Sequence, residues 1–248
     1  MVMHTVWFSV MEWNALLEAY PADQAGIYKA KTLRESIDRY MADMDLPVLD
    51  EQWQESGVIA DIMPDLARIL ARVWQETTGQ APDFDMHAML ENAIMKGQTP
   101  RIEAMDDEAL QVLVNHAFAR LLFLLRAKNQ NLIPATWTQG KCPFCGTYPR
   151  VAFETENGRT LCCPLCGHSW PFARVRCTVC NNADHATLGY FEAEGLDDIR
   201  VYFCRACNHY LKVIDARKRP VRDAETEDAL SLELDDLARK EDFIEAPQ

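Results

Sequence analysis

Apolar side chains in the first half of the chain recur about every 3.6 residues, the spacing that gathers them on one face of an α-helix. The longest such pattern begins after the acidic run 106–108 and should end near Lys128-Asn129, before Pro134. Its apolar positions are Leu110, Leu113, Val114, Ala117, Phe118, Leu121, Leu122 and Leu125. This face is wide enough to form the centre of a helical domain.

Three more helices are predicted over residues 26–44, 65–76 and 85–96. Pro64 should open the second of them, because proline is favoured in the first turn of a helix. His116 lies on the flank of the long helix, and there we expect a satisfied, buried or half-buried histidine rather than a metal ligand.

The hydrophobic pattern changes after residue 140, where short β-prone runs replace the helical spacing. Two runs flank Asn157-Gly158, a dipeptide typical of tight hairpins, and two more flank a polar turn over 195–198. A last short helix is predicted from about Thr226 to Lys240. It should dock on another part of the chain or on a partner, because so short a helix is unstable alone in water. Together the patterns predict an α+β protein.

Four Cys-x-x-Cys pairs accompany the β-prone runs and contain every cysteine of the chain except Cys162. Gly or Asn follows each pair, and these residue types most readily adopt the positive φ of a metal-binding knuckle. A redox-active pair would instead open a helix, and no helical pattern follows any of the four. We therefore interpret the pairs as metal ligands and Cys162 as a non-ligating thiol. The predicted ligands are Cys142, Cys145, Cys163, Cys166, Cys177, Cys180, Cys204 and Cys207.

The two predicted hairpins favour a sequential pairing, in which the first and second pairs share one metal ion and the third and fourth share another. A cross-braced arrangement remains an alternative, although it would use neither hairpin. Each site would have four thiolates, which suits zinc or a rubredoxin-like iron and leaves no open position for a reactive water. His168, His185 and His209 are expected near the sites rather than in them.

The charge of the chain narrows the classes of partner that it can bind. The chain carries a formal net charge of −13, but residues 141–220 hold 11 Lys and Arg against 8 Asp and Glu. Nucleic acid is therefore a poor partner for the whole molecule, because such binding depends on cationic side chains. Arg174, Arg176, Arg205 and the run 217–219 could still form a local basic patch.

The N-terminus shows no secretory signal, and no segment reaches the roughly 18 apolar residues of a membrane span. We expect a cytoplasmic protein with reduced thiols and no membrane partner. No P-loop, Rossmann fingerprint or nucleophile elbow is found, so no enzyme class is indicated.

These patterns predict a helical domain over residues 1–135, a double metal-binding domain over 136–215, and an acidic helical tail over 216–248. The two metal modules would span 142–166 and 177–207. Because bound metal replaces part of the hydrophobic core that a small domain otherwise needs, a chain of 248 residues can form both domains.

Three stretches of the second half combine the cysteine pairs with neighbours at fixed spacing: CPFCGTYPR, GRTLCCPLCGHSWPFARVRCTVC and CRACNHYLKVIDARKRP. They resemble the formate dehydrogenase accessory protein family, and the tail EDALSLELDDLARKEDF resembles that family's C-terminal helix. The matching positions of the middle and last stretches are Leu161, Cys163, Cys166, Trp170, Arg174, Cys177, Cys180, Cys204, Cys207, Tyr210, Leu211 and Lys212.

This resemblance implies a non-catalytic maturation factor with an N-terminal helical domain, two tandem rubredoxin-like or zinc-ribbon modules and a C-terminal helix. It would bind the molybdenum- or tungsten-containing catalytic subunit of formate dehydrogenase in the cytoplasm, with iron or zinc in each tetrathiolate site. Trp170 and Arg174 are the candidate partner contacts. Packing between the modules is the alternative role for Trp170, and a salt bridge to an acidic helix is the alternative for Arg174.

Two other classes of function fit the cysteine pattern. A zinc-ribbon interaction module of nucleic-acid machinery would bind zinc only, and the acidic balance of the chain counts against it. A thiol–disulfide oxidoreductase would need at least one pair that is metal-free, exposed and of low pKa. The sequence also leaves a homodimer open.

Overall fold

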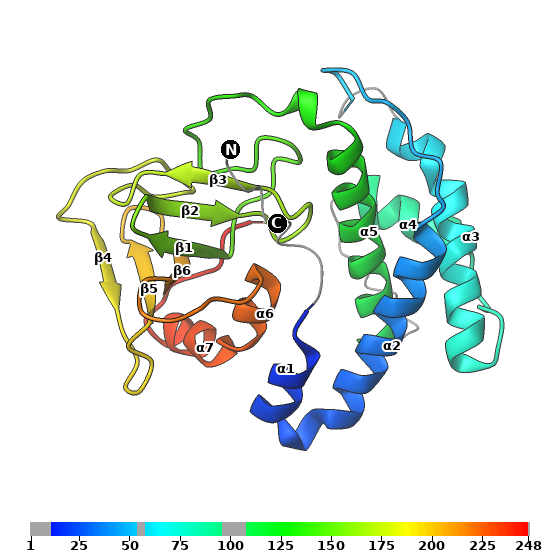
Figure 1. Ribbon diagram of the computed structural model, residues 1–248, viewed down its shortest axis with the longest axis horizontal. Helices are drawn as coiled ribbons and strands as arrows, with labels where there is room; N and C mark the ends of the chain where they lie inside the picture. Colours follow the sequence, from blue (N-terminus) through cyan, green and yellow to red (C-terminus); the bar gives the residue numbers. More distant parts are fainter. Residues whose placement is uncertain (1–10, 54–57, 96–107, 248) are drawn as a thin grey trace. The chain divides into compact units, whose positions relative to one another are not determined.

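The computed structural model describes residues 11–53, 58–95 and 108–247, and the side chains of 58, 92–95 and 108–113 lie outside the description (Figure 1). The chain divides into two compact units. One is Tyr20–Leu132, and the other joins Ile133–Gln248 to the N-terminal segment that ends at Ala19. The predicted boundaries at 135/136, between the two domains, and at 215/216, where the tail begins, stay predictions.

The first unit is helical, as the spacing of apolar residues predicted. Leu33, Ile37 and Met41 of one helix and Leu66 and Leu70 of another are buried in its core. His116 is buried, and its Nδ1 accepts a hydrogen bond from Arg34 Nε at 2.8 Å. The expectation of a satisfied histidine is confirmed. The elements are η1 (Pro21–Asp23), α2 (Gln24–Met41), α3 (Val58–Thr78), α4 (Met86–Met95), α5 (Glu108–Lys128) and η2 (Gln130–Leu132).

One helix begins earlier than predicted, and another was not predicted. α3 begins at Val58, so Pro64 lies inside the helix rather than opening it. Proline there removes one main-chain hydrogen bond, but Ile62 and Met63 just before it are buried, and their packing favours a helix that starts earlier. The short helix α1 (Trp13–Ala19), which belongs to the second unit, was not predicted.

The second unit contains one six-stranded sheet with the order β3-β2-β1-β6-β5-β4. Both predicted hairpins are present, β1/β2 around Asn157-Gly158 and β4/β5 around the turn near Gly195. Parallel pairing of β1 with β6, in which Val151 faces Lys212, joins the two modules into a single sheet. The strands are β1 (Val151–Thr155), β2 (Gly158–Cys162), β3 (Ser169–Phe172), β4 (Leu188–Phe191), β5 (Ile199–Cys204) and β6 (Tyr210–Asp215).

The predicted C-terminal helix is two helices, α6 (Ala224–Ala229) and α7 (Leu232–Lys240), rather than one. The side chain of Asp223 caps α6 by accepting a hydrogen bond from the N–H of Thr226 at 2.9 Å. Buried Ser231 separates the helices, and its hydroxyl donates to the carbonyl of Glu227 at 2.7 Å. Because that carbonyl lies in the last turn of α6, this bond helps to end the helix there.

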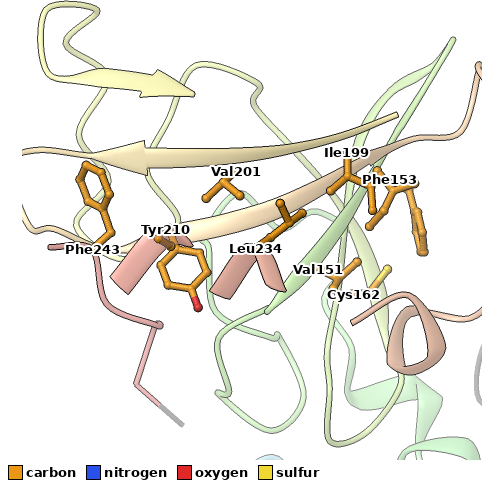
Figure 2. Close-up of a cluster of buried hydrophobic side chains, with 10 residues drawn as sticks. Val151, Phe153, Cys162, Ile199, Val201, Tyr210, Leu234 and Phe243 are labelled. Carbon is orange, nitrogen blue, oxygen red and sulfur yellow. The ribbon is translucent and has the colours of Figure 1, made fainter. Parts of the chain in front are cut away.

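The two C-terminal helices cover one face of the sheet (Figure 1). Figure 2 shows the core between the sheet and these helices, in which Leu234 and Phe243 pack against strand residues. The strand residues of this core are Val151, Phe153, Cys162, Ile199, Val201, Tyr210 and Ile214. The sheet residues that point away from these helices form the opposite face. None of the helices in the described part of the chain has the length and hydrophobicity of a membrane span.

Candidate metal centres

The first cysteine cluster forms where the β1/β2 hairpin brings the first two pairs together. Cys142 Sγ lies 3.5 Å from Cys166 Sγ, and Cys145 Sγ lies 3.4 Å from Cys163 Sγ. All four sulfur atoms lie within 4.8 Å of one another. Tetrahedral coordination with metal–sulfur bonds of about 2.3 Å requires sulfur–sulfur distances of about 3.8 Å. The cluster is therefore close to the size that a four-sulfur site needs.

The second cluster forms in the same way at the ends of β4 and β5. Cys177 Sγ lies 3.6 Å from Cys207 Sγ, and Cys180 Sγ lies 3.7 Å from Cys204 Sγ. These four sulfur atoms also lie within 4.8 Å of one another. The pairs are thus grouped sequentially, and the cross-braced alternative does not occur in this structure.

Each pair sits on the same backbone knuckle. The N–H of the first cysteine donates to the carbonyl five residues later, and the N–H four residues later donates back to the carbonyl of that cysteine. The residue after each pair has positive φ, as its type predicted. These residues are Gly146 (78°), Gly167 (67°), Asn181 (61°) and Asn208 (58°). This turn points backbone N–H groups toward sulfur, as from Val179 N to Cys177 Sγ at 3.4 Å.

The clusters differ in how far water can reach them. Three thiols of the first cluster are buried, and Cys166 is 0% exposed. In the second cluster Cys180 is exposed and Cys207 is half-buried. The first cluster therefore belongs to the interior of the unit, whereas the second lies at its surface.

Burial and hydrogen bonding shift the pKa values of several thiols in the clusters. Burial raises the pKa of Cys163 and Cys166 well above the usual thiol range, because a low-dielectric interior disfavours thiolates. Burial also raises the pKa of Cys204, but hydrogen bonds from the Asn182 amide and the Ala206 N–H outweigh it and lower that pKa to about 7. Four thiolates packed this closely require a cation, and zinc or iron suits four sulfur donors.

Cys162 lies outside both clusters, in the core beneath the C-terminal helices. Burial raises its pKa to about 12, although the Ser169 hydroxyl is 3.5 Å from its sulfur. The three histidines predicted to lie near the sites are also outside both clusters. The positions of Cys162 and of the histidines agree with their interpretation as residues that do not bind the metal.

The two predicted partner contacts occupy different environments. Trp170 is in β3 and only 2% exposed, and its indole N–H donates to the carbonyl of Gln139 at 3.0 Å. This position favours the alternative role in packing. Arg174 has a side chain that is 49% exposed. Its guanidinium pairs with Glu154 of β1, so its ion-pair partner lies on a strand rather than on an acidic helix.

The basic run 217–219 does not form a free cationic patch. Arg217 Nε lies 2.7 Å from an oxygen of Asp215, and Arg219 pairs with Glu227 at 2.6 Å and with Asp198. Carboxylates thus neutralise Arg217 and Arg219, and Lys218 donates a hydrogen bond to the main-chain carbonyl of Asp197.

Lys212 and Tyr210 fix the C-terminal helices to the sheet, a role that sequence reasoning missed. Lys212 is 1% exposed, and its Nζ lies 2.7 Å from Asp228 and 2.8 Å from Asp235. The Tyr210 hydroxyl donates to Asp235 at 2.8 Å. Burial and the neighbouring Asp235 carboxylate raise the pKa of Tyr210, so it stays protonated as the donor. The acidic residues of the tail were the sequence signal that could have revealed this role, since a buried lysine needs carboxylate partners.

Comparisons with known proteins connect this geometry to a family. The family described as "FdhE, C-terminal domain" matches residues 175–247. The FdhE homolog of Aquifex aeolicus (strain VF5) is 36% identical over 113 residues, which cover 44% of this chain and 40% of that protein. Protein FdhE of Salmonella paratyphi A is 26% identical over 223 residues, covering 85% of this chain and 69% of that protein.

The FdhE homolog of Shewanella oneidensis is 26% identical over 197 residues, and the match covers 75% of this chain and 62% of that protein. The chain thus spans less than two thirds of the Aquifex and Shewanella relatives. Among solved structures, the FdhE protein from Pseudomonas aeruginosa superposes with a TM-score of 0.65 at 17% identity. That match covers 95% of this chain and 92% of the other, and it shows a shared fold.

Proposed function

We propose that this chain, which belongs to the formate dehydrogenase accessory protein family represented by FdhE, binds the catalytic subunit of a molybdenum- or tungsten-dependent formate dehydrogenase and assists its assembly in the cytoplasm. The observation that carries the proposal is the match of the FdhE C-terminal domain to residues 175–247. That range contains the second cysteine cluster, strands β4 to β6 and both C-terminal helices.

Each cysteine cluster would hold one metal ion, iron or zinc, and the donor sets support this assignment. The eight ligands would be the four cysteines of the first cluster and the four of the second. Zinc would act only as a structural ion, whereas a four-sulfur iron could change oxidation state with little change in geometry. Four sulfur ligands leave no open position for a substrate water, which supports a non-catalytic role.

Arg174 is the candidate partner contact that the structure favours. Its side chain is half exposed, and Glu154 holds the guanidinium in place, so little side-chain entropy would be lost on binding. Trp170 would act on the partner only indirectly, by fixing Gln139 and the loop that precedes the first knuckle.

Changing Arg174 to Ala should weaken capture of the catalytic subunit by about 10-fold, the loss expected for an interface arginine. The measurement is quantitative mass spectrometry of proteins retained from anaerobic lysate of the native organism, with the full chain as bait. Metal content should stay at two ions per chain, because Arg174 lies outside both clusters.

Arg239→Ala is the matched control, since Arg239 is exposed on α7 and should leave capture unchanged. Equal capture by Arg174→Ala and wild type would remove Arg174 from the interface, and joint loss of metal and capture would make its role structural. Recovery of ribosomal or polymerase proteins without a formate dehydrogenase subunit would contradict the proposed function itself.

A further inference from the structure

A pocket of about 280 Å³ lies on the face of the sheet opposite the C-terminal helices. Its floor is made by side chains that the strand register places on one face: Leu188 and Tyr190 of β4, Tyr202 and Cys204 of β5, and Leu211 of β6. One wall is the segment Arg174–Thr178, which leads into the third knuckle.

The pocket adjoins the more exposed of the two metal centres. Cys177 and Cys204, one cysteine from each knuckle of the second cluster, line it. A molecule bound in the pocket would therefore contact the surroundings of the second cluster and leave the buried first cluster untouched.

Three arginines line the pocket, although the chain as a whole is acidic. Arg159, Arg174 and Arg176 line the pocket, and none of its lining residues is Asp or Glu. Arg159 and Arg174 share the carboxylate of Glu154, and the Arg159 guanidinium lies 4.1 Å from the centre of the Tyr202 ring. Arg176 is half-buried and pairs with no carboxylate among the described residues. Arg176 is therefore the arginine of the pocket that can pair with a carboxylate of an occupant.

Apolar side chains remain exposed at the same pocket. Val175 is 46% exposed and Tyr190 is 52% exposed, and both line it. Exposed apolar side chains gathered at one pocket are a common feature of interaction sites. The volume is slightly below the range of about 300–1,000 Å³ typical of sites for whole small molecules, and it suits one large side chain.

The pocket also lies along an edge of the sheet. β4 is the last strand in the order and pairs only with β5 among the described strands (Figure 1). An edge strand offers backbone N–H and C=O groups to which an extended segment can add. This edge therefore favours a polypeptide occupant over a free small molecule.

We propose that this pocket binds an extended peptide segment of a partner protein, in which a large aromatic side chain is next to acidic residues. The aromatic side chain would enter between Val175 and Tyr190, a carboxylate would pair with Arg176, and the backbone would lie along β4. The inference deepens the proposed function and rests on it, because the catalytic subunit would supply the segment.

The test measures binding of fluorescein-labelled peptides to the metal-loaded full chain by fluorescence anisotropy. The probe peptide is Ser-Asp-Glu-Trp-Glu-Asp-Ser, one comparison peptide has Lys at each acidic position, and another has Ser in place of Trp. The probe should bind at least about 10-fold more tightly than either comparison peptide, because each loses one of the two recognition elements.

Arg176→Glu should abolish probe binding, and Val175→Asp should weaken it at least about 10-fold, with Arg239→Glu on α7 as the unchanged control. Arg176 adjoins Cys177, so Arg176→Glu could also lose metal. In that case Tyr190→Ser, which removes an apolar contact on β4, provides a second test and should also weaken probe binding. Equal affinity of the wild type for all three peptides, or no measurable affinity for the probe, would overturn the inference. So would a wild-type dimer that Arg176→Glu dissociates, since the occupant would then be a second copy of this chain.

The outcomes separate this inference from the proposed function. Capture of the catalytic subunit by Val175→Asp at the wild-type level would contradict the inference about the pocket but not the proposed accessory role. Selective binding of the probe by a wild-type chain that captures no catalytic subunit would support the pocket and contradict the accessory role.

Discussion

Changing Cys166 to Ser should remove the ion of the first cluster and abolish cooperative unfolding of the metal-binding unit, the second unit of the fold, which contains both clusters. Cys166 is 0% exposed, and its cluster lies in the interior between the β1/β2 hairpin and the first two knuckles. In zinc-finger peptides, structural zinc contributes an apparent free energy of about 10–16 kcal/mol, similar to the whole stability of a domain, about 5–15 kcal/mol. Native mass spectrometry would count the ions, and thermal unfolding followed by circular dichroism would report the transition.

Two further serine variants make this prediction specific. Cys162→Ser changes a buried thiol outside both clusters and should keep both ions, at a cost of about 1–3 kcal/mol for the buried hydroxyl. Cys180→Ser changes an exposed ligand and should weaken only the second site. Two ions and an unchanged melting temperature for Cys166→Ser would contradict the structural role of the first cluster.

Replacing Lys212 with Ala should lower the free energy of unfolding of the metal-binding unit by about 3–5 kcal/mol, the usual cost of breaking a buried ion pair. Lys212 is 1% exposed and lies between Asp228 and Asp235, so its removal leaves Asp235 buried without its cation. Asp228 keeps Arg150, whose Nε lies 3.0 Å away. Urea unfolding followed by circular dichroism would measure the change.

Lys240→Ala is the matched control, because Lys240 is exposed in the last turn of α7 and should change stability by no more than about 0.5 kcal/mol. The double variant Lys212→Met with Asp235→Leu should recover much of the loss, since a hydrophobic pair can replace a buried ion pair. A loss below about 1 kcal/mol for Lys212→Ala would show that this contact does not hold the helices to the sheet.

Local signals in the sequence were sufficient to predict the metal centres. The spacing of the cysteine pairs, the Asn157-Gly158 turn and the Gly or Asn after each pair all act within a few residues. Each knuckle is closed by hydrogen bonds between residues at most five positions apart, so its geometry follows from its own sequence. The sequential grouping follows because each hairpin joins neighbouring pairs.

Long-range contacts were not predictable in the same way. Parallel pairing of β1 with β6 joins residues about sixty positions apart, and short β-prone runs do not specify a distant partner strand. The same pairing turns two expected modules into one sheet and gives it the face that α6 and α7 cover. Lys212 was recognised as a motif position, but its role became clear only when Asp235 was placed beside it.

The most direct test of the accessory role is formate-dependent dye reduction by extracts of an anaerobically grown deletion strain of the native organism. The account predicts low activity in the deletion strain although the catalytic subunit is still synthesised. Wild type and Cys162→Ser should restore activity, whereas the double variant Cys177→Ala with Cys180→Ala should not, because it removes half of the second cluster. Full formate dehydrogenase activity in the deletion strain would contradict the account.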